Sequence, residues 1–390
     1  MATVGRTFCR VLFAATVALV AGACRGRGRE QPRPASSASA PASLPSVVTS
    51  ADAGASDGSV GDELVVVLGG DVNLGRGIGR RILRGDQPRP FAGLEPILST
   101  ADLVFVNLES QLSDQRGETQ SSWSPLVFTG PPGGADLLAD AGIHAVSLAN
   151  NHVWDYGKQA FFQTLTHLER AGVAYVGASR EPDQMYEPVV LRKKGFSVAL
   201  FAVTEIWNQG AFRGHAGEHH VAWADYDQLE GRLRAARQAH DVVLLGYHGG
   251  GEYMEAPLPA LQKFAERVMQ TGLDALAGHH PHVPQGIGWH AGHPIFYSLG
   301  NLIFHMHKDF PWTGTSFLAR LTFGHDRSLR VEACPYHIVA NEPLLFEGPG
   351  REVRERMIRR HLAVLSYALG GISVGEPVEH SCMSLSPRAN

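Results

Sequence analysis

Short apolar runs alternate with amphipathic stretches along most of the chain, beginning near Glu63. Several runs are apolar at nearly every position, a pattern typical of strands covered on both faces in mainly parallel sheets. The predicted strands lie at residues 63–71, 101–110, 143–151, 173–178, 196–205, 241–250, 273–280 and 294–301. With helices fitting between them, the pattern predicts an α/β fold.

The amphipathic stretches predict the helices. They lie at residues 158–172, 227–239 and 259–272. Two later apolar stretches, 315–323 and 328–339, flank a turn-like segment and predict an antiparallel hairpin. An arginine-rich amphipathic helix over 351–369 closes the folded part. Solvation is the simplest explanation of its basic face, and contact with a surface or polyanion is the alternative.

The start of the chain has the layout of a secretory signal. Arg6 and Arg10 precede an apolar stretch, residues 11–23, that is too short to span a bilayer comfortably. Small residues before Cys24 resemble a bacterial lipoprotein cleavage site. We therefore expect residues 1–24 to be a signal peptide and a lipid on Cys24 to anchor the exported chain in the bacterial cell envelope. Secretion to the periplasm or medium, and an uncleaved anchor, are the alternatives.

Residues 25–61 are rich in Pro, Ser, Ala and Gly and contain few large apolar side chains. Such a segment cannot bury enough surface to fold, so it is predicted to be a disordered linker. The folded domain is expected to cover residues 62–375, and residues 376–390 are expected to form a C-terminal tail.

The net charge bears on the class of partner, and the cysteine content bears on the presence of a disulfide. A net charge of −4 at pH 7 argues against a nucleic-acid partner. Of four cysteines, Cys9 and Cys24 lie in the signal, which leaves Cys334 and Cys382 for the folded domain. The two could pair in an oxidising compartment, but a free buried Cys334 fits the strand pattern equally well.

Polar side chains stand where the predicted strands end. They are Asp71, Asn107, Glu109, Asn150, Asn151, His152, His248, Glu252, His279, His280 and His282. Taken alone, each has an ordinary explanation, as a helix cap or a hydrogen-bonded imidazole. In open α/β sheets, however, ligands bind at the carboxyl ends of the strands. Carboxylates, amides and imidazoles gathered there are what a binuclear transition-metal site requires.

Two local spacings add to this picture. In extended backbone alternate residues point the same way, so His280 and His282 are expected to reach two adjacent metals. Arg76, Arg80 and Arg84 share one face of a helix that follows the first strand. They would either clamp a phosphate or carboxylate or form an ordinary solvent-facing surface.

Six motifs in order resemble the CapA family, which is associated with bacterial poly-γ-glutamate capsule synthesis and related to calcineurin-like metallophosphoesterases. They are GGDVNLGR, FVNLES, LANNHVWDYG, GYHGGGEY, GHHPHVPQG and YSLGNLIF, between Glu63 and Phe304. The resemblance covers about two thirds of the chain, and ordered motifs are more specific than a single one. It implies a four-layer α/β/β/α sandwich of the metallophosphoesterase type.

The resemblance also implies roles for individual residues. The implied metal ligands are Asp71, Glu109, Asn151, His248, His280 and His282. His152 matches the catalytic histidine, and His279 competes with His280 because the histidine is doubled. Asn73 stands where the phosphoesterases carry a histidine, and Glu109 stands near their bridging aspartate. Both departures put metal affinity or catalytic power in doubt.

The expected protein is a cell-envelope metal-dependent hydrolase with two divalent ions, Mn, Fe or Zn. It would act in the synthesis, export or anchoring of an anionic polymer of the poly-γ-glutamate type, within a capsule synthesis complex. Arg76, Arg80 and Asn301 are expected to contact the substrate, although Asn301 could instead brace the site. An extracytoplasmic phosphoesterase and a non-catalytic binding lipoprotein are the alternatives. Asp155 is expected to orient the loop or the His152 ring, whereas Asn150 has no predicted chemical task.

Overall fold

The computed structural model describes residues 63–86, 88–304 and 309–388. The predicted signal, its lipidation site Cys24 and the whole of the predicted linker lie outside the described residues. No helix in the described part combines the length and hydropathy that a membrane span needs.

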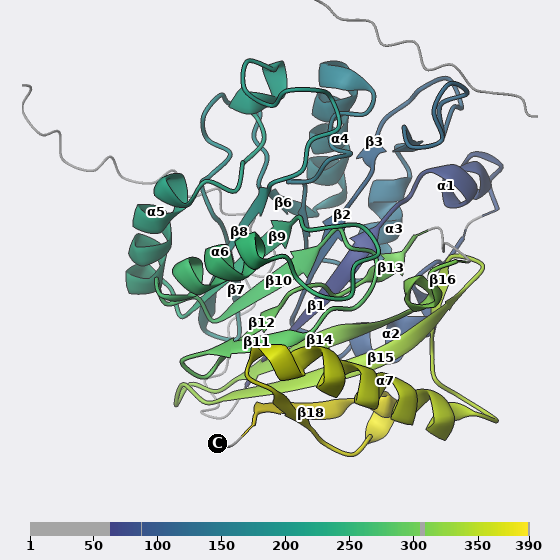
Figure 1. The fold of residues 1–390 in the computed structure, drawn as a ribbon. Helices are drawn as coiled ribbons and strands as arrows, with labels where there is room; N and C mark the ends of the chain where they lie inside the picture. Colours follow the sequence, from purple (N-terminus) through teal and green to yellow (C-terminus); the bar gives the residue numbers. More distant parts are fainter. Residues whose placement is uncertain (1–62, 87, 305–308, 389–390) are drawn as a thin grey trace, which may run out of the picture. The chain divides into compact units, whose positions relative to one another are not determined.

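The elements alternate along the chain, as Figure 1 shows. The strands are β1 (Leu64–Val72), β2 (Leu103–Leu108), β3 (Gln111–Leu112), β4 (Thr129–Gly130), β5 (Ala145–Ser147), β6 (Ala174–Val176), β7 (Val189–Lys193), β8 (Phe196–Thr204), β9 (Val242–His248), β10 (Ala275–His279), β11 (Ile287–His290), β12 (His293–Phe296), β13 (Asn301–Ile303), β14 (Thr315–Phe323), β15 (Leu329–Val339), β16 (Glu342–Leu345), β17 (Ile372–Val374) and β18 (Met383–Pro387). The α-helices are α1 (Arg76–Leu83), α2 (Glu95–Leu98), α3 (Gly134–Asp140), α4 (Gly157–Ala171), α5 (Tyr226–Ala239), α6 (Pro259–Met269) and α7 (Arg351–Ser366). Short 3₁₀ turns are η1 (Ala92–Leu94), η2 (Ala216–His219), η3 (Pro311–Gly314), η4 (Tyr367–Leu369) and η5 (Glu379–Ser381).

Two large sheets carry the fold. The first has the strand order β17-β18-β15-β14-β1-β2-β5-β6, with β13 beside β1 and β16 beside β15. The second has the order β11-β12-β10-β9-β8-β7. The strands β1, β2, β5 and β6 are parallel, as are β8, β9, β10 and β12. Parallel strands direct their carboxyl ends to one edge of each sheet, where the predicted polar residues lie.

Three apolar cores separate four layers. Val104 faces α4, where it shares a core with Leu165, whereas the next residue, Phe105, shares the inter-sheet core with Leu244. Leu245 faces the opposite way and packs with α5 and α6. In Figure 1, α3 and α4 lie beside β1 and β2, and α5 and α6 lie beside β9 and β10. The predicted α/β/β/α sandwich is confirmed.

The helix ends follow local chemistry. The α4 helix stops at Gly172, whose φ of 73° is the left-handed conformation that glycine adopts easily. Asp225 caps α5 by accepting a hydrogen bond from the Asp227 backbone N–H (3.0 Å). The predicted helix over 259–272 forms as α6 but ends at Met269, ahead of Gly272.

The C-terminal segment is part of the sheet. The predicted tail, residues 376–390, contains β18, which pairs with both β15 and β17. Cys334 in β15 is joined to Cys382 by a disulfide with an S–S distance of 2.00 Å. The folded domain therefore runs to Pro387, beyond the predicted boundary at residue 375. The short β18 could not be predicted from sequence because it joins the sheet through β15, which lies far away in the chain.

Candidate metal centre

The polar strand ends meet at one place. In the register of the first sheet, Asp71 of β1 lies beside Asn107 of β2. In the second sheet, His248 of β9 lies beside His279 of β10. Asp71 and Asn107 are fully buried, and His248 is 1% exposed. The carboxyl ends of both sheets thus contribute to one enclosed polar cluster.

Asp71 is held from three sides. Asn107 Nδ2 donates to Asp71 Oδ1 at 2.9 Å, and the His280 backbone N–H donates to Asp71 Oδ2 at 3.1 Å. His282 Nδ1 lies 3.2 Å from Asp71 Oδ2. Burial alone would raise the pKa of Asp71, but hydrogen bonding to His282 and its positive charge hold the pKa below its ordinary value.

Glu109 has the opposite environment. Its Oε1 atom is buried and has no hydrogen-bond partner among the described residues. Three imidazole Nε2 atoms surround it, at 3.7 Å for His248 and His282 and 3.9 Å for His152. Burial and the neighbouring Asp71 charge raise the pKa of Glu109 well above its ordinary value. A cation at this position would compensate the negative charge of Glu109, which is buried beside the negative charge of Asp71.

Two groups of three side chains have ligand atoms within 4.8 Å of one another, and they share Glu109. One group is Glu109, His248 and His280, and the other is Asp71, Glu109 and His282. Burial and neighbouring histidines lower the pKa of His248 well below its ordinary value, and they lower the pKa of His280 to about 3. Both rings are therefore neutral, which is the form that binds metals. The donor set of each group fits a divalent metal ion.

Asn151 joins this set through a neighbouring atom. Its Oδ1 lies 2.7 Å from His248 Nε2, the atom that also faces Glu109. The amide oxygen therefore stands beside the first ligand group, consistent with its predicted position as a metal ligand.

His152 is held in a defined orientation at the edge of the cluster. Its Nδ1 lies 2.9 Å from Asp155 Oδ2, so Nε2 is turned towards Glu109. The ring stacks on Phe128 with centroids 4.2 Å apart. The His152 backbone N–H donates to Asn150 Oδ1 at 3.1 Å, and Asn150 Nδ2 donates to the Leu108 carbonyl at 2.9 Å. Asn150 therefore ties the His152 loop to the end of β2, which is the task that sequence analysis could not assign.

The histidine segment differs in backbone from the prediction. His280 and His282 have φ values of 94° and 59°, so they are left-handed and not extended. Their rings nevertheless face the same cluster, with centroids 6.0 Å apart. His279 turns away, with its Nε2 3.1 Å from the Gly69 carbonyl. The structure thus places His280, and not His279, among the candidate ligands.

The three residues predicted to contact the substrate lie in different places relative to the candidate site. Arg76 lies beside the site, with its guanidinium 4.5 Å from the Phe128 ring centroid. Arg80 is exposed on α1, and none of the site contacts described above involves it. Asn301 is fully buried, and its Oδ1 lies 3.0 Å from His282 Nδ1. Asn301 thus braces a candidate ligand, which was the second of its two predicted roles.

The departure at Asn73 has a local explanation. Asn73 Oδ1 accepts a hydrogen bond from the Gly75 backbone N–H at 2.8 Å, in the turn that leads into α1. The side chain is 4% exposed and does not belong to either ligand group. The first ligand group therefore draws its imidazoles from His248 and His280.

Comparison with known protein families identifies the family of this chain. A model of the family described as bacterial capsule synthesis protein PGA_cap matches residues 65–306, well over half of the chain. The chain belongs to the PGA_cap family. The motif-based resemblance to CapA is thereby confirmed, and the matched residues include both candidate ligand groups.

Individual proteins that are similar to this PGA_cap chain include two CapA proteins. The PGA biosynthesis protein CapA of Bacillus subtilis (strain 168) is 28% identical over 280 residues, covering 71% of this chain and 72% of the relative. The capsule biosynthesis protein CapA of Bacillus anthracis is 26% identical over 289 residues, covering 72% and 69%. Among solved structures, a putative 5'-nucleotidase from Staphylococcus aureus aligns with a TM-score of 0.42 and 13% identity, covering 73% of this chain and 54% of that one.

Three residues of the PGA_cap site were not assigned a role from sequence. Asn107 bonds Asp71 and lies 3.1 Å, through Nδ2, from His248 Nδ1. Its place near the end of β2, two residues before Glu109, was the available signal. Phe128 and Phe304 form an aromatic wall, and Phe304 lies 4.3 Å from the His282 ring centroid. Phe128 comes from a loop with no periodic pattern, so sequence offered no signal for it.

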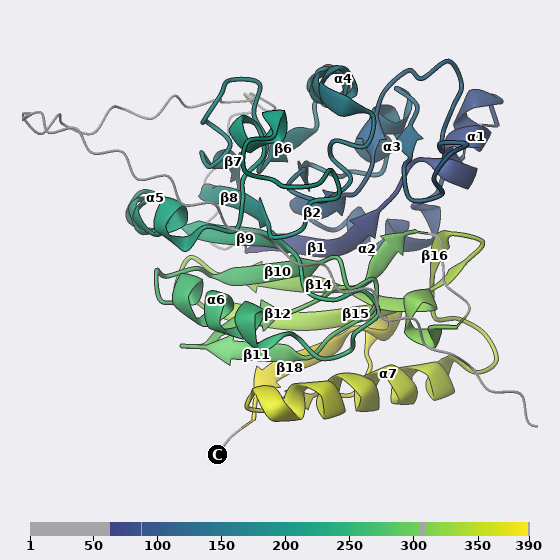
Figure 2. The ribbon, with the colours of Figure 1, turned by 45° about the horizontal axis from the view of Figure 1, so that its top comes forward.

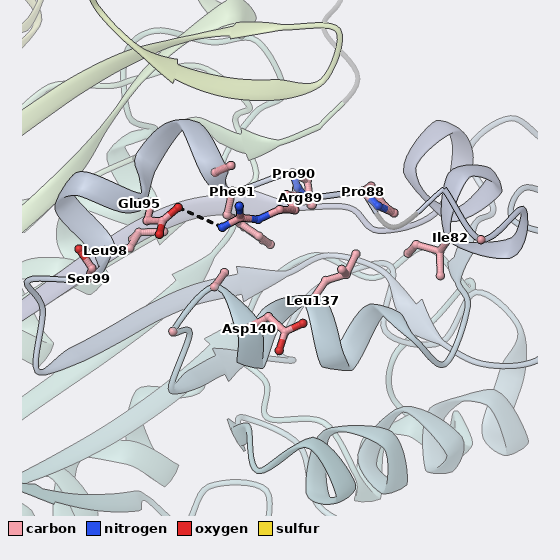
Figure 3. Close-up of a pocket in the computed structure, with 14 residues that line it drawn as sticks. Ile82, Pro88, Arg89, Pro90, Phe91, Glu95, Leu98, Ser99, Leu137 and Asp140 are labelled. Carbon is pink, nitrogen blue, oxygen red and sulfur yellow. Dashed lines mark hydrogen bonds and ion pairs between the residues drawn. The ribbon is translucent and has the colours of Figure 1, made fainter.

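The PGA_cap domain also has a cavity of about 820 Å³ at the other edge of the first sheet (Figure 3). It lies between α2 and the end of α3, where β2 and β5 begin. Arg89 and Glu95 form an ion pair of 3.1 Å along one wall, and Leu137 and Asp140 lie on the opposite wall. Neither candidate ligand group contributes to this cavity.

Proposed function

We propose that this chain acts in the synthesis, export or anchoring of an anionic polymer of the poly-γ-glutamate type, as a metal-dependent hydrolase of the bacterial cell envelope. The observation that carries the proposal is the pair of buried ligand groups that share Glu109, whose Oε1 accepts no hydrogen bond from the residues that the structure describes. Membership of the PGA_cap family supports the polymer class.

The ligand roles follow from position. Asp71 and His282 would hold one ion, His248 and His280 the other, with Glu109 between them and Asn151 beside His248. When bound, two divalent ions, Mn, Fe or Zn, would polarise the substrate and lower the pKa of a water molecule to near neutrality. The Asn107 amide fixes the Asp71 carboxylate, and Asn301 fixes the His282 ring. Such supporting contacts hold ligands in the orientation that binding needs.

His152 is placed to handle a proton. Asp155 holds its Nδ1 side, so the Nε2 atom faces the cluster and would donate a proton to the leaving group. Phe128 covers the ring and limits the access of water, since His152 is only 5% exposed.

Arg76 supplies the positive charge for an anionic substrate. Its guanidinium stacks on Phe128 and donates through Nη2 to the Pro125 carbonyl at 2.7 Å. Burial lowers the pKa of Arg76, but the charges of Glu109 and Asp155 act in the opposite direction. A guanidinium beside the centre would bind a carboxylate of a glutamate polymer, and it would bind a phosphate equally well.

The export part of the proposal has separate support. The Cys334–Cys382 disulfide is typical of an oxidising compartment outside the cytoplasm. Attachment through a lipid on Cys24 is part of the proposal, and mass spectrometry of the protein isolated from bacterial membranes would test it.

The central experiment compares the full chain with His152→Ala. Bound Mn, Fe and Zn would be measured after supplementation, and hydrolysis of poly-γ-glutamate and of an aryl phosphate diester would be assayed. We expect two equivalents of metal in both proteins and a loss of about 10²- to 10⁴-fold in polymer cleavage for His152→Ala. The matched control is His219→Ala, which removes an imidazole that is paired with Asp183 on the surface and should leave both readouts unchanged.

The outcomes separate the alternatives. Hydrolysis of the phosphate diester alone would replace the polymer with a phosphoester substrate. Metal binding without either activity would indicate a binding protein. Absence of stoichiometric metal after supplementation would overturn the metal-dependent function altogether.

A further inference from the structure

The outer face of α7 carries an apolar stripe. Val353, Met357, Val364 and the adjoining Tyr367 of η4 are 49%, 58%, 62% and 72% exposed. Their spacing places them on one side of a helix, because positions 4, 11 and 14 residues after Val353 return to the same face. The opposite side of α7 is buried in the inter-sheet core through Ile358 and Leu362. Figure 2 draws α7 at the margin of the ribbon, with no described helix or strand on its outer side.

Two arginines lie within the same stripe. Arg360 is exposed and has no ion-pair partner among residues 63–86, 88–304 and 309–388. Arg356 makes only a long contact, 3.6 Å from Glu352, and both of these side chains are mostly exposed. A groove of about 610 Å³ runs beside them, lined by Met357, Arg359 and Val374 among others. The face therefore combines exposed apolar side chains with two exposed positive charges, of which Arg356 has one long ion-pair contact and Arg360 has none among the described residues.

We propose that this face of α7 docks on an anionic lipid surface. Apolar side chains of an interfacial helix enter the boundary between headgroups and acyl chains, while arginines reach the lipid phosphates. Tyrosine is favoured at the same depth because its ring is apolar and its hydroxyl is polar. Val353, Met357, Val364, Tyr367 and the two arginines together meet these requirements.

Two other occupants fit less well. In a two-fold interface between copies, Arg360 lies at the centre of the stripe and would face its own equivalent, an unfavourable pairing of like charges. A soluble polyanion would engage Arg356 and Arg360 but would leave Val353, Met357 and Val364 exposed to water. Of these three occupants, the lipid surface is the one that uses both components of the face.

The test is sedimentation of the full chain with two kinds of vesicle. All samples carry Cys24→Ser, so that no lipid on this residue contributes. We expect stronger binding to vesicles of equal parts phosphatidylglycerol and phosphatidylcholine than to phosphatidylcholine alone. Arg356→Gln/Arg360→Gln should reduce the anionic excess about thirtyfold, and Met357→Ser/Val364→Ser about tenfold.

The controls distinguish a local effect from misfolding. Arg234→Gln removes an exposed arginine from α5, where it is paired with Glu230, and should leave vesicle binding unchanged. Each variant should keep the urea midpoint of the parent, because every substituted side chain is exposed.

Three outcomes would overturn the proposal. Equal binding to both vesicle types, or binding unaffected by the α7 variants, would show that another segment is responsible. A dimer that is dissociated by Met357→Ser/Val364→Ser, without vesicle binding, would assign the face to a second copy. Retention on poly-γ-glutamate that needs Arg356 and Arg360, without vesicle binding, would assign it to the polymer.

Discussion

The two sides of the first sheet bury different chemistry. At the edge where β1 and β2 end, the fully buried side chains include Asp71 and Glu109, and Glu109 Oε1 has no hydrogen-bond donor among the described residues. Where β15 and β18 pair, the fully buried residues Cys334, Cys382 and Met383 are apolar or disulfide-bonded. Burying carboxylates side by side is unfavourable, whereas burying apolar groups and closing a disulfide are favourable.

This contrast indicates a division of labour within one domain. The buried carboxylates of the candidate metal centre lower the stability of the metal-free protein. The apolar contacts and the disulfide of the C-terminal strands offset this loss. If so, variants in the second region should change stability without changing metal binding, and variants in the first should change metal binding while stabilising the metal-free protein. The predictions below test this separation.

The largest expected effect belongs to the disulfide. Cys334→Ala/Cys382→Ala removes a bond between residues 48 positions apart. On the chain-entropy account this lowers the free energy of unfolding by about 4 kcal/mol, measured by urea denaturation. Metal stoichiometry at low urea should stay the same, because neither cysteine belongs to a ligand group. Loss of metal in the folded variant would show that the two regions are not separable.

The next effect belongs to the shared ligand. Glu109→Gln keeps the shape of the side chain but removes its charge, so metal affinity should fall by at least about a hundredfold in competition titrations. In chelator-treated protein the same change should raise the free energy of unfolding by about 1–2 kcal/mol, since a buried charge beside Asp71 is removed. Glu181→Gln, at an exposed carboxylate that belongs to neither ligand group, is the matched control and should change neither quantity.

The stability of the metal-free protein should also depend on pH. Because burial and Asp71 raise the folded-state pKa of Glu109, the folded chain binds its proton more tightly than the unfolded chain does. Stability from this group is therefore present below the unfolded pKa near 4.5 and is lost as the pH rises through the folded pKa. The difference in stability between Glu109→Gln and wild type should grow over that range. A constant difference would contradict the raised pKa.

The layers and most of the candidate ligands could be predicted from the sequence, and the physical reason is the same for both. Continuous apolar runs mark strands buried on both faces, and parallel strands bring their polar ends together. Asp71, Glu109 and His248 could therefore be chosen from strand ends alone. The choice of His280 over His279 could not, because it depends on a left-handed turn at His280 that no local pattern specifies.

Other features depend on contacts between distant residues. The three arginines of the α1 segment share a helical face in sequence, yet Arg76 turns to Phe128 while Arg84 pairs with Asp86. Arg76 has a φ of 49°, so it stands at a bend where helical spacing does not apply. The β18 strand and the choice between paired and free cysteines were likewise decided by residues far apart in the chain.

The smallest expected effect distinguishes the two ligand groups of the candidate metal centre. Asn301 Oδ1 contacts His282 Nδ1, while Asn301 Nδ2 donates to the Thr313 carbonyl at 3.1 Å. Asn301→Ala should therefore loosen only the ion held by Asp71 and His282, and lower its affinity about tenfold. Calorimetric titration of metal-free protein with Mn²⁺ should show one of two binding events weakened, and exposed Asn208→Ala should weaken neither. Equal weakening of both events would mean that Asn301 supports the whole cluster, so that the two ligand groups act as one unit through Glu109.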